Sequence, residues 1–216
     1  MCWYWFEQVN LCIKMGKIIY RFETPKYPGN IVYINLISKF DCVNNCKFCS
    51  KDENNIYERK AGCSLYLSES PSIEEIMEKL SFEKDFDEVA IIGLGEPLIY
   101  IDKVSSLVKK IKEKYDVVVR VDTNGVLGDV NKLKELDKIY ISLNAVNKEE
   151  YNELCNPTIE DSFNKVVAFV KECVKSPIDT YVSFVIFDDS RNKEYISFAK
   201  SLGIDEGNVI LRDFVW

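Results

Sequence analysis

Six short apolar runs alternate with helical segments along this chain of 216 residues, and that alternation limits its fold more than any other feature. The first run, residues 31–37, is almost continuously apolar, as expected for a parallel strand that is buried on both faces. Several segments between the runs carry apolar residues three and four positions apart, which is typical of helices with one buried face. The predicted strands cover residues 31–37, 88–92, 117–121, 138–143, 180–187 and 208–214.

The segments between the strands predict a series of helices. Ser70-Pro71-Ser72 is expected to start the first helix, and Asp102 is expected to cap the second. Further helices are expected over residues 129–136, 147–154, 159–175 and 191–202. Strands and helices in series imply a parallel sheet with helices outside it. We therefore predict one α/β domain, a partial (β/α)6 barrel over residues 31–216, with an open sheet as the alternative and residues 1–30 as an N-terminal extension that packs on the core.

The composition narrows the classes of function. The formal net charge is −7, which weakens the case for a wide nucleic-acid interface but leaves a local basic patch open. The sequence contains no histidine, which removes the commonest general base and every Ser-His or Cys-His catalytic pair. No apolar run is long enough to cross a membrane, and we expect a cytoplasmic protein.

Three cysteines, Cys42, Cys46 and Cys49, follow the first predicted strand with the spacing C-x3-C-x2-C. Iron–sulfur clusters are usually held by four cysteines, so three close thiolates suggest a cluster with one iron left open to a small molecule. An all-cysteine zinc site with Cys63 as fourth ligand is one alternative. A non-catalytic cluster that only carries electrons is another.

Glycine and polar residues follow the next three predicted strands at the point where each strand ends. Ligands of α/β proteins bind at the carboxyl ends of the strands, so these residues are expected to meet at one rim. Glycines there allow the backbone to approach a ligand closely, and a carboxylate can face a cationic group. The candidate binding residues are Gly93, Gly95, Glu96, Thr123, Asn124, Ser142 and Asn144.

The cysteine spacing, with Phe48 before the last cysteine, and the segment Gly93–Pro97 together resemble the radical S-adenosylmethionine (radical SAM) superfamily. The resemblance covers about residues 31–214, and Leu94 stands where glycine is commoner in the family. It implies a [4Fe–4S] cluster on Cys42, Cys46 and Cys49, with the fourth iron chelated by SAM. It also implies that Gly93, Gly95 and Glu96 hold the SAM ammonium, that Ser142 and Asn144 face the ribose or the methionine carboxylate, and that Val209–Leu211 line the adenine.

At finer grain, Ile141–Ala145 and Tyr151–Pro157 resemble the TatD-associated radical SAM proteins. Cys155 in this segment is left between a structural and a catalytic role, whereas Cys173 is predicted to be a core residue. The resemblance implies reductive cleavage of SAM to a 5′-deoxyadenosyl radical that abstracts hydrogen from an unknown small-molecule or protein substrate. It also implies a one-electron reductant such as ferredoxin or flavodoxin. Activation of a glycyl-radical enzyme, RNA modification and 7-deazaguanine formation are the open reaction types.

Overall fold

The computed structural model describes residues 16–22, 30–49 and 64–213 of the chain. Its centre is one seven-stranded sheet in which the strands follow their sequence order from β1 to β7. Strands β2 to β7 are parallel, and only β1 runs antiparallel to its neighbour β2. The strands are β1 Ile19–Tyr20, β2 Ile31–Ile34, β3 Glu88–Ile91, β4 Val118–Thr123, β5 Lys138–Ser142, β6 Asp179–Ile186 and β7 Val209–Asp213.

Five α-helices and three short 3₁₀ segments connect the strands within the described residues. Ser72 caps the first of these helices by accepting a hydrogen bond from the Glu75 amide, as the sequence predicted. The helices are α3 Ile73–Leu80, α4 Ile101–Lys114, α5 Lys148–Cys155, α6 Ser162–Val174 and α7 Asn192–Ser201. The 3₁₀ segments are η1 Pro97–Tyr100, η2 Asp189–Arg191 and η3 Glu206–Asn208.

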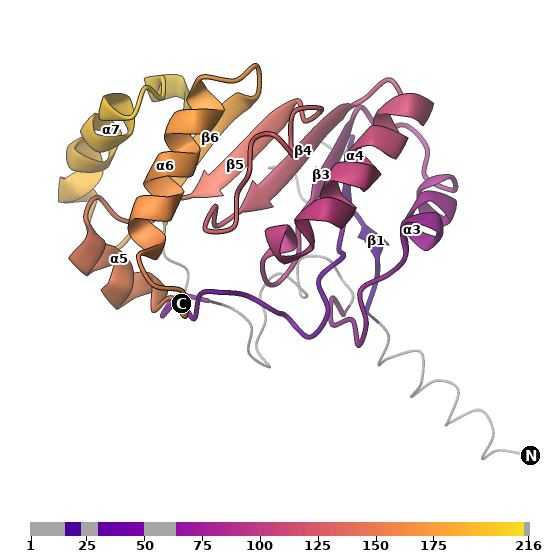
Figure 1. Cartoon of the computed structure of the whole chain (residues 1–216), viewed down its shortest axis with the longest axis horizontal. Helices are drawn as coiled ribbons and strands as arrows, with labels where there is room; N and C mark the ends of the chain where they lie inside the picture. The colour runs from indigo at the N-terminus through magenta and orange to yellow at the C-terminus, as the bar shows by residue number, and fades with distance from the viewer. Residues whose placement is uncertain (1–15, 23–29, 50–63, 214–216) are drawn as a thin grey trace, which may run out of the picture.

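The helices α4 and α6 lie on one face of the sheet (Figure 1). Apolar side chains of the strands and helices form a large core in this layer, including Val121, Ile141 and Phe184. A smaller apolar cluster on the other side joins Tyr20, Tyr33 and Leu94 near β1–β3. The sheet does not close, because β1 and β7 are its two edges. The parallel strands β2 to β7 and the helices that connect them confirm the predicted α/β fold.

Two local predictions were wrong. Residues 129–136 form turns, not a helix, because the Asp129 side chain accepts a hydrogen bond from the Asn131 amide and stabilises a local turn. Asp102 does not cap α4, because the 3₁₀ segment η1 leads directly into this helix from Pro97. The short strand β1 was not predicted, and it lies in the described part of the expected N-terminal extension.

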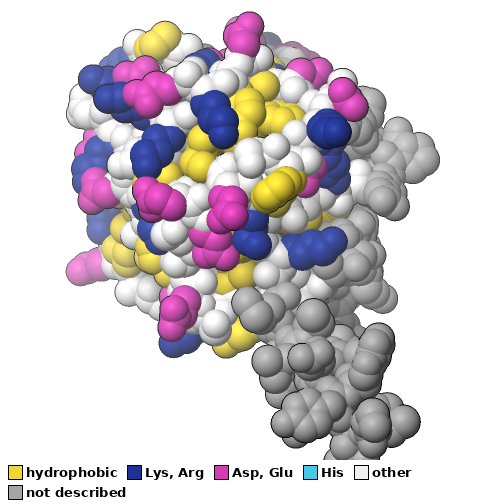
Figure 2. All heavy atoms as spheres, turned by 90° about the vertical axis from the view of Figure 1, so that its right-hand side faces the viewer, with side chains coloured by type: hydrophobic (Ala, Val, Ile, Leu, Met, Phe, Trp, Pro, Cys, Tyr) yellow, Lys and Arg dark blue, Asp and Glu magenta, His cyan; other side chains and the backbone are white. Residues whose placement is uncertain are grey.

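Acidic and basic side chains are intermixed on the face shown in Figure 2, with small hydrophobic patches between them. Among the described residues, no helix is long and apolar enough to cross a membrane.

Candidate functional site

The three cysteines lie on the loop that follows β2, along the edge where the parallel strands end (Figure 1). Cys42 and Cys46 are half-buried, and Cys49 is exposed. A turn in this loop is closed by a hydrogen bond from the Cys49 amide to the Cys46 carbonyl oxygen, with 3.0 Å between nitrogen and oxygen. The predicted ligands therefore share one short loop at the rim of the sheet.

The cysteine loop is held against the carboxyl end of α5. The Asn45 amide donates to the Cys155 carbonyl at 3.0 Å, and the Lys47 amide donates to the Leu154 carbonyl at 2.9 Å. These carbonyls belong to the last turn of a helix, where backbone acceptors have no partner inside the helix. The loop thus pairs its amides with the open carbonyls of α5.

A buried side-chain contact reinforces this attachment. The Asn44 amide Nδ2 donates to the Tyr151 hydroxyl at 3.0 Å, and Tyr151 is fully buried. Burial raises the pKa of Tyr151, so the hydroxyl stays neutral. Sequence reasoning singled out the segment Tyr151–Pro157 through the resemblance but missed its contact with the cysteine loop.

The glycines of the Gly93–Pro97 segment make room for the protein's own backbone. Gly95 has φ of +135°, and a Cβ atom at this position would lie 2.4 Å from the Asp41 carbonyl oxygen. The Glu96 amide donates to that same oxygen at 2.8 Å. A Cβ atom at Gly93 would lie 2.5 Å from Asn35 Oδ1. The segment is therefore packed directly against the chain between β2 and the cysteines.

The Glu96 carboxylate is buried, with 1% exposure, and joins two strand ends. Its Oε1 accepts from the Leu98 amide at 2.9 Å and from Thr123 Oγ1 at 2.6 Å. Its Oε2 accepts from the Asn124 amide at 2.7 Å. The carboxylate thus connects the end of β3 to the end of β4.

Asn124 extends this connection to the cysteine loop. Its Oδ1 accepts from the Val126 amide at 3.0 Å, which fixes the orientation of the side-chain amide. Its Nδ2 then donates to the Cys42 sulfur at 3.5 Å, and the main-chain N–H of Asn44 donates to the same sulfur at 3.4 Å. Two N–H groups are therefore directed at one predicted cluster ligand.

Ser142 and Asn144 lie together at the end of β5. Asn144 is buried with φ of +60°, and its Nδ2 lies 3.9 Å from the Cys155 sulfur. Arg212 of β7 donates through Nη2 to Ser142 Oγ at 3.4 Å and to Asn144 Oδ1 at 3.3 Å. Sequence reasoning missed Arg212, although it directly follows Val209–Leu211, which lie on β7.

The two other cysteines of the described chain are buried in the core. Cys173 packs among apolar side chains, and burial raises its pKa to about 12, as expected of a core residue. Cys155 is fully buried at the end of α5 and accepts the Asn45 amide through its carbonyl oxygen. Both positions support structural roles.

The donors at the cysteine loop suit an iron–sulfur cluster. Three cysteine side chains on one loop offer soft sulfur ligands, and N–H groups aimed at a sulfur are a common feature of such sites. Within residues 16–22, 30–49 and 64–213, however, no three Cys, Asp or Glu side chains are arranged to hold a metal ion. The fit therefore depends on the chemistry of the donors, and the alternative ligand Cys63 lies outside the described residues.

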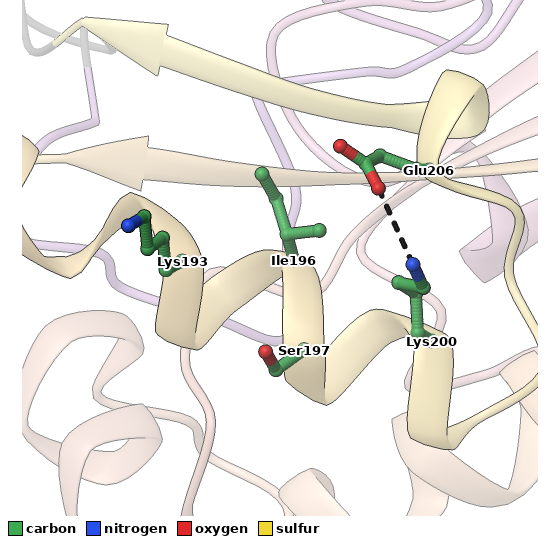
Figure 3. Close-up of a pocket in the computed structure, with 5 residues that line it drawn as sticks. All are labelled: Lys193, Ile196, Ser197, Lys200 and Glu206. Atoms are coloured by element: carbon green, nitrogen blue, oxygen red, sulfur yellow. Dashed lines mark hydrogen bonds and ion pairs between the residues drawn. The ribbon is translucent and has the colours of Figure 1, made fainter.

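A separate hollow of about 450 Å³ lies between α7 and η3. Figure 3 shows Ile196 and the ion pair of Lys200 and Glu206 at this hollow, with 3.3 Å between Nζ and Oε2. None of its lining residues is one of the predicted site residues. We assign it no part in the site.

Comparison with known proteins begins with a sequence model described as the radical SAM superfamily, which matches residues 37–200. A protein named GTPase Obg from Brachyspira hyodysenteriae is 30% identical over 145 residues, which cover 64% of this chain and 21% of that protein. A protein named probable GTP 3',8-cyclase from Saccharolobus islandicus is 28% identical over 178 residues, which cover 78% of this chain and 53% of that protein. The chain thus spans about a fifth and about half of the length of these two relatives.

Solved structures show the same fold at low sequence identity. A structure of TYW1 with a lysine-pyruvate adduct bound has a TM-score of 0.62 and 16% identity, covering 87% of this chain and 65% of that chain. A structure of anSMEcpe with bound AdoMet has a TM-score of 0.60 and 18% identity, covering 86% of this chain and 52% of that chain.

Proposed function

Because this chain belongs to the radical SAM superfamily, we propose that it is an enzyme that cleaves S-adenosylmethionine reductively and abstracts hydrogen from a substrate. The observation that carries the proposal is the single rim that joins Cys42, Asn124 and Glu96 through consecutive hydrogen bonds. When bound, a [4Fe–4S] cluster and SAM supply one-electron chemistry that breaks the C5′–S bond and yields a 5′-deoxyadenosyl radical.

The loop cysteines Cys42, Cys46 and Cys49 would hold three irons of the cluster. The N–H groups of Asn44 and Asn124 would donate to the Cys42 sulfur and so stabilise added negative charge on reduction. Cys49 is exposed, which suits electron entry from a reductant such as ferredoxin or flavodoxin.

The segment Gly93–Glu96 would hold the SAM ammonium mainly through backbone carbonyls. At least three of the roughly four acceptor positions of the Glu96 carboxylate face donors, and this gives its side chain chiefly a positioning role. Thr123, Asn124, Ser142 and Asn144 complete the proposed SAM site at the ends of β4 and β5.

At finer grain, we propose that the chain belongs with the TatD-associated radical SAM proteins. The segments Ile141–Ala145 and Tyr151–Pro157 carry this resemblance in the sequence, and the second of them holds the cysteine loop in place. The relative named for a GTP cyclase supports a purine nucleotide as the first substrate to test, in line with the 7-deazaguanine type of reaction.

The proposal is tested by anaerobic reconstitution of the full chain, followed by addition of SAM and dithionite. We expect about four irons and four sulfides per chain and release of 5′-deoxyadenosine. Cys42→Ala should lose this product, whereas Cys173→Ala, which removes a cysteine outside the loop, should keep it. One zinc per chain, or product formation equal in wild type and Cys42→Ala, would overturn the proposal.

A further inference from the structure

The sheet face opposite the helices carries mainly polar side chains over β4–β7, with the apolar residues Val185 and Ile210 beside them on β6 and β7, and we call it the open face. Side chains of this face contact one another across the three strands β4, β5 and β6: the Arg120 guanidinium lies 4.4 Å from the Tyr140 ring centre, and the Tyr140 ring packs at a tilt on the Tyr181 ring. The alternate side chains of these strands enter the apolar core with the helices. The open face is defined by Arg120, Asp122, Tyr140, Ser142, Tyr181, Ser183 and Arg212.

Most charges on the open face have opposite charges beside them. Arg120 is 2.7 Å from Glu88 and 2.9 Å from Asp122, with only 7% of its side chain exposed. Lys138 lies 3.4 Å from the same Glu88. Burial raises the pKa of Asp122 to about 6, although Arg120 and Arg212 oppose this shift. The ion pairs account for the burial of these charges without a bound ligand.

Arg212 differs from the other charged residues of this face. It forms no ion pair with any described residue, and its Nη2 donates only to the neutral oxygens of Ser142 and Asn144, at 3.4 and 3.3 Å. Its Nε is buried and has no hydrogen-bond partner. A guanidinium offers a planar fork of donors that matches a carboxylate or a phosphate, and a buried donor without a partner is costly.

We propose that Arg212 binds an anionic oxygen group, a carboxylate or a phosphate, of a molecule bound on the open face. The inference rests on the proposed function, because the partners Ser142 and Asn144 belong to the proposed SAM site. The anion has two sources: the substrate, or the methionine carboxylate of SAM. In either case Arg212 selects for a molecule that carries a negatively charged oxygen group at this position.

The first arm of the test needs no cluster. Thermal unfolding of the full chain is measured against rising inorganic phosphate or acetate, with chloride added to hold the ionic strength constant. A ligand that binds only the folded state raises the midpoint. We expect the wild type to be protected and Arg212→Gln to need about tenfold more anion for the same protection, with Arg212→Lys between them. Lys193→Gln, which removes a cation at the hollow between α7 and η3, is the control and should behave as wild type.

The second arm measures SAM affinity of the reconstituted protein by the spectral change of its cluster. An affinity for SAM within about twofold of wild type, with phosphate protection lost, assigns the anion to the substrate. An affinity for SAM that is about tenfold weaker in Arg212→Gln assigns it to the SAM carboxylate. If the variant matches wild type in both arms, the proposal is overturned. Because the phosphate arm is independent of SAM cleavage, its result stays separate from that of the proposed function.

Discussion

Replacing Glu96 by glutamine tests whether this carboxylate joins the ends of β3 and β4. The carboxylate accepts hydrogen bonds from Leu98, Thr123 and Asn124, at 2.9, 2.6 and 2.7 Å. In Glu96→Gln one oxygen becomes an NH2 group, which cannot accept from the Asn124 amide. That bond is charge-assisted and worth about 1.5–3 kcal/mol. The bonds that remain become neutral and weaker.

The expected loss in the free energy of unfolding is therefore about 3 kcal/mol. In a domain of this size, each kcal/mol lowers the midpoint temperature by about 2–4 °C, so the midpoint should fall by about 6–12 °C. Thermal and urea unfolding of the full chain at neutral pH measure this difference. The matched control is Glu113→Gln, which makes the same change on an exposed position of α4.

The opposite result is equally informative. If Glu96→Gln unfolds at the same temperature as Glu113→Gln, the three hydrogen bonds do not stabilise the fold. Glu96 would then be available mainly as a ligand for a cation, and the positioning role assigned to it would be wrong.

Three further predictions concern the cysteine loop and the open face. Tyr151→Phe removes the hydroxyl that accepts from Asn44 and should cost about 1 kcal/mol in urea unfolding; a loss near zero would argue against the loop attachment. Asn124→Ala removes an N–H donor to the Cys42 sulfur and should move the cluster midpoint potential to more negative values in an EPR-monitored titration, whereas an unchanged potential would contradict that contact. Burial raises the pKa of Asp122 from its ordinary 3.8 to about 6, so the unfolded chain loses this proton first and the group's contribution to stability falls as pH rises through this range. Asp122→Asn should flatten that fall in unfolding measurements from pH 4 to 7, and a slope equal to wild type would refute the shift.

The order of strands was predictable because buried parallel strands are nearly continuous apolar runs. Such runs identify Ile31–Ile34 and Glu88–Ile91, with ends that differ by one to three residues from the predicted ranges. Strand β1 has only two residues, and so short a segment has no periodicity to detect. Residues 129–136 look helical in composition, but the side chain of Asp129 forms a turn instead.

The sequence identified the residues of the candidate site more readily than the contacts among them. Cysteine spacing and the glycines indicated where chemistry would lie. The use of Gly95, however, depends on how closely the Asp41 backbone approaches it, which only the folded chain shows. The same holds for Tyr151 and Arg212, because their partners Asn44 and Ser142 are distant in sequence.

The most direct measurement is the EPR spectrum of the reduced cluster before and after addition of SAM, in wild type and in Cys63→Ala. If the loop cysteines leave one iron open, SAM should change the spectrum, and Cys63→Ala should respond as wild type does. A spectrum that SAM leaves unchanged in wild type, or a cluster that is lost in Cys63→Ala, would show that a fourth protein ligand closes the cluster.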